Sequence, residues 1–138
     1  MTKADRMPRS FRKDFPPITR TTLALYAGAS GDHNAVHIDS DAAKAAGFDD
    51  VFAQGMLIMA YMGRTLTEVI PQECLRQFSA RFLAVTQLGA RLGCIGNAGE
   101  PYDEDNERRI AFDLEIRDQN DQVKLRGRAV TVLKEGEI

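Results

Sequence analysis

The residues Gly55-Met-Leu-Ile-Met-Ala-Tyr-Met62 form a run that is apolar at almost every position and opens on a glycine. A helix that is apolar on all sides is buried rather than amphipathic. The charged residues Arg64 and Glu68 mark its exposed end, and Pro71 stops it. We therefore expect a buried helix from Gly55 to Val69 at the centre of the molecule.

The chain after this helix has the pattern of β-strands. Every second residue from Ile110 to Ile116 is apolar, which is the period of a strand with one buried face. Further strands are expected over residues 75–85, 91–97 and 123–133, with a long hairpin loop at 99–109 and a turn at 119–121. A buried helix followed by antiparallel strands predicts an α+β fold, in which one sheet wraps around the helix.

The segment before the buried helix is expected to be less regular. Residues 1–15 are interpreted as a flexible N-terminal arm, and residues 16–138 as the folded domain. A short helix at 23–29 should be capped by Thr21 or Thr22. A second short helix at 41–46 should be capped by Asp39 or Ser40.

Three polar residues lie in the loop between these two short helices: an acid (Asp32), an amide (Asn34) and an imidazole (His37). Asp, Asn and Gly are common in turns for backbone reasons alone, so a plain turn is one interpretation. Next to a loop that enters a buried helix, the same groups suit acid–base chemistry beside a carbonyl. The N–H of Gly55 has no side chain in the way and can hold developing negative charge at the helix start.

The residues Gly31-Asp-His-Asn-Ala-Val-His37 resemble the G-D-x-N-P-[LIV]-H motif of the (R)-specific enoyl-CoA hydratases, a group of the MaoC-like dehydratases. The likeness continues where the family commonly has x-H-G-[ML], here Ala53-Gln-Gly-Met-Leu57. Arg81-Phe82 with Gly89 echoes the family's R-F-x-x-P-V-x-x-G-D. Four residues depart from the family pattern: Ala35, Val85 and Ala90 replace two prolines and an aspartate, and Gln54 replaces a histidine.

The resemblance implies a single hotdog domain that adds water reversibly to a trans-2-enoyl-CoA thioester. By this analogy Asp32 and His37 carry protons, Asn34 positions the water or hydroxyl, and the Gly55 N–H forms the oxyanion hole. No metal is expected, and no cofactor beyond the coenzyme A or acyl-carrier part of the substrate. A hotdog leaves a sheet edge unpaired, so we expect a homodimer or a dimer of dimers.

Other functions stay open at the level of sequence. The thioester carrier is either coenzyme A or an acyl-carrier protein. Ala35 and Gln54 leave room for a non-catalytic acyl-thioester-binding subunit of a hetero-oligomeric hydratase. A thioesterase is less favoured, because the start of the helix lacks the carboxylate that such enzymes usually carry there. The basic side chains of Arg64, Arg81, Lys124, Arg126 and Arg128 are interpreted as solvated charges, some able to meet coenzyme A phosphates.

The composition excludes several classes of protein. A chain of 138 residues with 43% hydrophobic residues is large enough for one domain. A net charge of −2 without interleaved basic and aromatic residues argues against nucleic-acid binding. Cys74 and Cys94 lack metal-ligand spacing and are expected to be reduced. The basic start lacks the apolar segment of a signal peptide, and no run is long enough to span a membrane, so we expect a cytoplasmic protein.

Overall fold

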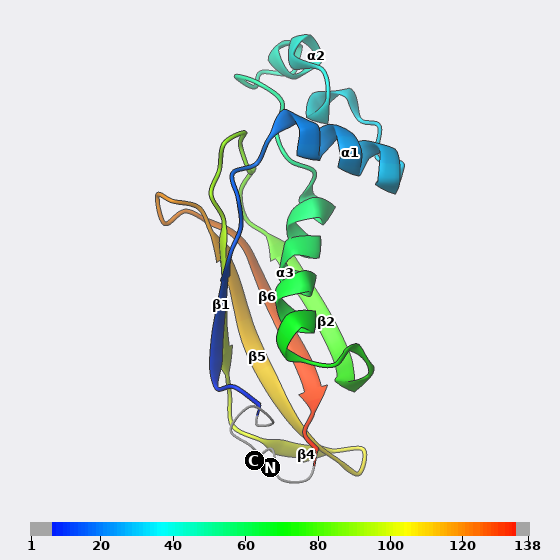
Figure 1. Ribbon diagram of the computed structural model, residues 1–138, viewed down its shortest axis with the longest axis vertical. Helices are drawn as coiled ribbons and strands as arrows, with labels where there is room; N and C mark the ends of the chain where they lie inside the picture. The colour runs from blue at the N-terminus through cyan, green and yellow to red at the C-terminus, as the bar shows by residue number, and fades with distance from the viewer. Residues whose placement is uncertain (1–6, 135–138) are drawn as a thin grey trace.

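In the computed structural model, which describes residues 7–134, an antiparallel sheet curves along one side of a long helix, α3 (Gly55–Val69) (Figure 1). The bounds of α3 are those that the sequence predicts. The strands lie in the order β1-β3-β5-β6-β2, and β4 pairs with β5 off this path. They are β1 Ser10–Asp14, β2 Leu75–Phe82, β3 Gly93–Ala98, β4 Tyr102–Glu104, β5 Glu107–Arg117 and β6 Val123–Val132. The predicted α+β architecture is confirmed.

The core forms between α3 and the inner face of the sheet. Buried α3 residues such as Met62 and Leu66 face the alternate apolar side chains of β5, among which Phe112 is fully buried. Each such side chain contributes about 1.5–3 kcal/mol when it is removed from water. A β-carbon at Gly127 of β6 would lie 2.5 Å from the Met62 sulfur and 2.9 Å from the Ser79 carbonyl oxygen, so a larger residue there would displace its neighbours.

The flexible arm predicted for residues 1–15 is wrong for Ser10–Asp14, which form β1. This strand pairs with β3, in a register that runs from Ser10 opposite Asn97 to Asp14 opposite Gly93. Phe11 packs against Phe112, with ring centroids 5.3 Å apart. The arm orders because β3 supplies backbone partners that lie far away in sequence. Residues 1–6 of the predicted arm lie outside the described residues.

Two further predictions need correction. Helix α1 spans Arg20–Ser30, and Thr19, rather than Thr21 or Thr22, caps it by accepting the N–H of Thr22. The predicted loop at 99–109 contains β4 and the start of β5, joined through a two-residue turn. Asp105 and Asn106 have φ angles of 51° and 61° there, the left-handed conformation that a tight hairpin requires. The predicted Asp39 cap of α2 (Ser40–Ala45) is confirmed.

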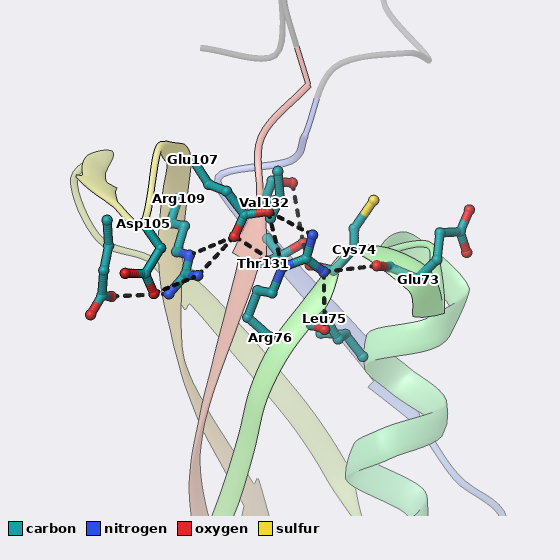
Figure 2. A network of polar contacts seen from close by, with 10 residues as sticks. Glu73, Cys74, Leu75, Arg76, Asp105, Glu107, Arg109, Thr131 and Val132 are labelled. Carbon is teal, nitrogen blue, oxygen red and sulfur yellow. Dashed lines mark hydrogen bonds and ion pairs between the residues drawn. The ribbon is translucent and has the colours of Figure 1, made fainter.

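Helices α1 and α2 cover the end of the molecule where α3 begins, and an ion-pair network ties the strands at the opposite end (Figures 1 and 2). Arg76 of β2 and Arg109 of β5 both hydrogen-bond the carboxylate of Glu107 (Figure 2). These hydrogen bonds lower the pKa of Glu107 to about 2, and the bond from Arg76 makes the largest contribution. Within residues 7–134, no helix is both long and apolar enough to cross a membrane.

Candidate active site

The loop that follows α1 is held by its own polar side chains. Gly31 ends the helix in the left-handed conformation, with φ of 78°. The Asp32 carboxylate then accepts the N–H of Asn34 at 3.2 Å. The Asn34 side-chain oxygen accepts the N–H of Val36 at 3.4 Å and caps a short 3₁₀ helix, η2 (Ala35–His37). The turn interpretation of these residues is therefore correct, and it does not compete with a chemical role.

The 3₁₀ turn brings His37 back toward Asp32. The imidazole Nε2 lies 3.8 Å from Asp32 Oδ2, too long for a direct hydrogen bond but short enough for one water or hydroxyl to contact both. On the other side of the ring, Nδ1 lies 2.8 Å from the carbonyl oxygen of Phe52. Because a carbonyl only accepts, Nδ1 carries the hydrogen, and in the neutral ring Nε2 presents its lone pair toward Asp32.

These two groups differ in their contact with solvent. The side chain of His37 is 10% exposed, whereas that of Asp32 is 42% exposed. The Phe52 ring also packs edge-on against the imidazole, with centroids 5.0 Å apart. The position of His37 is thus fixed from two sides, whereas the Asp32 carboxylate beside it stays in contact with solvent.

A pocket of about 340 Å³ joins His37 to the start of α3. Its walls are mostly apolar, and its lining consists of His37, Phe52, Ala53, Gly55, Ile58, Phe82, Ala84, Val85, Thr86 and Lys124. The first N–H groups of a helix have no intrahelical partner, and the Gln54 side chain makes no capping bond to them. The N–H of Gly55 is therefore available in the same pocket as the imidazole.

A larger hollow of about 1040 Å³ lies elsewhere, over the outward-facing residues of β1, β3 and β5. None of the predicted site residues lines it. Its charged side chains largely neutralise one another, since Glu115, for example, pairs with both Arg117 and Arg126. The smaller pocket is the candidate active site because His37 lines it and Asp32 lies beside His37.

The structure places two of the four predicted site residues, His37 and Gly55, in one pocket, and a third, Asp32, next to His37. Asp32 does not line this pocket itself, and its link to the site is the 3.8 Å distance between its Oδ2 and His37 Nε2. Asn34 lies in the same loop, but its side chain is engaged in capping η2 and does not line the pocket. Its predicted role in positioning water stays a prediction.

The departures from the family motif fall in different environments. Gln54 is fully buried, and its amide donates to the Leu23 carbonyl of α1 at 2.9 Å, so it fastens α1 to the start of α3. Ala35 is exposed at the start of η2. Val85, which falls within the strand expected at 75–85, lies beyond the end of β2 and lines the pocket.

Some site residues escaped the sequence analysis. The backbone carbonyl of Phe52 orients His37, and no side-chain pattern can reveal such a role. Lys124, interpreted as a solvated charge, is only 2% exposed and lines the pocket, so that interpretation is wrong. Its position between the apolar residues Val123 and Leu125 of a strand predicts an outward-facing side chain, so the sequence held no signal of its burial.

The chain belongs to the family of the MaoC like domain, whose sequence model matches residues 3–115. R-Hydratase PhaJ1 from Pseudomonas aeruginosa is similar in structure with a TM-score of 0.80 and 23% identity, over 94% of this chain and 83% of that chain. The (R)-hydratase from A. caviae involved in PHA biosynthesis gives a TM-score of 0.79 and 18% identity, over 96% and 100%.

The ChsH1-ChsH2 complex from Mycobacterium tuberculosis contains a further similar chain, with a TM-score of 0.76 and 16% identity over 90% of this chain and 89% of that chain. No curated protein matches this chain by sequence. At these identities the solved structures establish the fold, which is the hotdog fold that the sequence predicts.

Proposed function

We propose that the protein is an (R)-specific enoyl-CoA hydratase, working reversibly as an (R)-3-hydroxyacyl-CoA dehydratase. One observation carries the proposal: the imidazole of His37 and the carboxylate of Asp32, 3.8 Å apart, lie beside an apolar pocket that also contains the start of α3. Membership of the MaoC-like family supports it. Beyond the thioester carrier in the substrate, the proposed reaction needs no cofactor.

In the direction of hydration, a water molecule contacts both Asp32 and His37. One of the two groups takes a proton from water while the water oxygen bonds to C3 of the enoyl thioester. The π electrons move onto the thioester oxygen, where the Gly55 N–H and the α3 dipole stabilise the negative charge. The enolate then collapses back to the thioester as the pair passes a proton to C2, so that one water supplies both the C3 hydroxyl and the C2 hydrogen. The pair as a whole neither gains nor loses a proton, and dehydration reverses each transfer.

The size of the pocket favours a short acyl group. A volume of about 340 Å³ lies near the lower end of the range of about 300–1,000 Å³ that is typical of ligand sites. The carrier part of the substrate must remain outside such a pocket. Coenzyme A is the carrier we propose, and an acyl-carrier protein is the alternative.

The experiment is a hydration assay with trans-2-butenoyl and trans-2-octenoyl thioesters of both carriers. Asp32→Asn and His37→Gln should each lower the rate about 100- to 10,000-fold, since each removes a proton carrier. Asp39→Asn is the matched control: its side chain caps α2, and asparagine caps a helix as well as aspartate does. Acyl-CoA binding without any turnover would support a non-catalytic subunit instead.

We also propose that the protein forms homodimers through the free edge of β2, the last strand in the sheet order. Exposed apolar side chains lie at the end of this strand, directly after it and at the start of α3: Phe82 at 50%, Leu83 at 43%, Val85 at 47% and Met56 at 57%. Such side chains next to a free strand edge favour association. Light scattering should give twice the 15.3 kDa chain mass or a multiple of it, and a fully active monomer would exclude the proposal.

The cytoplasmic location stays a prediction.

A further inference from the structure

A buried ion pair forms part of the pocket wall through Lys124, which lines the pocket. The side chains of Lys124 and Asp118 are each 2% exposed, with Nζ and Oδ2 3.5 Å apart. Lys124 donates to the Val85 carbonyl at 2.8 Å and to the side-chain oxygens of Gln87 and Gln122. An ammonium group has three hydrogens, so these three acceptors satisfy it.

Asp118 is satisfied in the same way. Its carboxylate accepts the backbone N–H groups of Asn120 and Gln122 and the amide of Gln87. Burial raises the pKa of Asp118, but the hydrogen bonds outweigh this effect and hold the pKa below its ordinary value. The Asp118 side chain is therefore held as the carboxylate. A buried ion pair contributes little to stability compared with apolar residues of the same size. A role in holding neighbouring residues in place explains this pair better than a role in stability.

The pair is attached to the segment 83–87, which connects β2 toward β3 and forms one wall of the pocket. The backbone carbonyl of Lys124 accepts the N–H of Leu83, and the side-chain Nζ of Lys124 donates to the Val85 carbonyl. Ala84, Val85 and Thr86 line the pocket. Lys124 thus holds the wall at two points along its length.

The same segment is joined to the residues that orient the imidazole. The Thr86 carbonyl accepts the N–H of Ala53 at 2.8 Å, and Gln87 forms an isolated antiparallel bridge with Phe52. The Phe52 carbonyl accepts the hydrogen on His37 Nδ1. A continuous series of contacts therefore runs from the buried ion pair, through the wall, to the proton-transferring ring.

We infer that Lys124, supported by Asp118, is a positioning residue: it fixes the 83–87 wall against the acyl group and, through Phe52, fixes the tautomer and orientation of His37. The link to the acyl group rests on the proposed function. The link to His37 does not, because it concerns hydrogen bonds within the chain.

The test uses the double variant Lys124→Met/Asp118→Asn, alongside Lys124→Met alone. The single variant leaves a buried carboxylate without its cation and is expected to fold poorly. The double variant removes both charges and so separates positioning from that electrostatic penalty. Lys13→Met is the matched control, because Lys13 forms an ion pair with Glu68 on α3, away from the pocket lining.

The first readout is kinetic. In the folded double variant, kcat/KM should fall about 10- to 100-fold, as a loosened site does. KM should rise, and the discrimination between butenoyl and octenoyl thioesters should weaken, because the wall no longer limits the acyl chain. Lys13→Met should leave these values unchanged. A folded double variant with wild-type kcat, KM and chain-length preference would overturn the inference.

The second readout needs no substrate. The chain has two histidines, His33 and His37, so ¹⁵N spectra of the imidazoles are simple to assign. His37 should show the Nδ1–H tautomer in the wild type and lose this preference in the double variant, while exposed His33 stays unchanged. An unaltered His37 tautomer would refute the link to Phe52. If the wild type hydrates no thioester, the proposed function fails, whereas this spectrum still decides whether Lys124 positions His37.

Discussion

Replacement of Gly55 by alanine adds one methyl group at the point where α3 begins and where the thioester oxygen is proposed to bind. A β-carbon there would lie 3.2 Å from Cε1 and 3.4 Å from Cδ1 of the Phe82 ring. The first contact is tight, but Phe82 is half exposed and its ring can shift by a few tenths of an ångström. We therefore expect the fold to survive.

The effects of this substitution on stability and on rate should have opposite signs. Alanine is favoured over glycine within a helix by up to about 1 kcal/mol, which offsets the strain against Phe82. The rate should fall, because the methyl group and the displaced ring crowd the approach of the substrate carbonyl to the Gly55 N–H. Loss of one oxyanion-hole donor lowers kcat by about 100- to 1,000-fold, and this is the largest loss of rate that we expect for Gly55→Ala.

The assay is steady-state hydration of trans-2-butenoyl-CoA together with thermal unfolding. Gly63→Ala is the matched control, since it makes the same change in the same helix beside another aromatic ring, at 3.4 Å from Phe78. Gly63→Ala should keep its rate, and Gly55→Ala should lose rate without loss of melting temperature. A Gly55→Ala enzyme with the full rate would show that the oxyanion is held elsewhere.

Three other predictions follow from the same structure. Asp32→Asn combined with His37→Gln should lower the hydration rate far less than the product of the two single effects, because the groups act as a unit; multiplicative losses would contradict the shared mechanism. The pKa of Glu107 is lowered from 4.5 to about 2, so its carboxylate stabilises the fold fully above pH 4.5, and this contribution is lost as the pH falls toward 2. Urea midpoints measured against pH should show that loss in the wild type and not in Glu107→Gln, in which Arg76 has lost its charged partner; equal slopes would refute the assignment. Leu83→Lys places a charge on the proposed dimer surface and should raise the monomer fraction in light scattering, whereas an unchanged mass would move the interface elsewhere.

The sequence predicted those elements whose causes lie close together in the chain. Helix α3 was found to the residue, because a glycine, an apolar run and a proline define it locally. The alternation around Phe112 likewise predicted β5. In the same way, Asp32 and His37 could be expected to lie close together because the loop that holds them spans only a few residues, while their catalytic role stays a prediction.

The features that the sequence did not predict depend on partners that lie far away along the chain. Ser10–Asp14 carries mostly charged and polar residues, and it becomes a strand only because β3 offers backbone groups from residues 93–97. Lys124 is buried because the Val85 carbonyl and Asp118 meet it from both sides. The Phe52 carbonyl contributes through the backbone, which gives no sequence signal at all.

The central claim is that Asp32 and His37 transfer both protons of the hydration from one side of the pocket. Its most direct test is hydration of trans-2-butenoyl-CoA in heavy water, with the product analysed by NMR and chiral chromatography. This mechanism predicts a single (R)-3-hydroxy product in which the C2 deuterium and the C3 hydroxyl were added to the same face. The Asp32→Asn variant should form this product only at its residual rate. A racemic product, or addition to opposite faces, would contradict it.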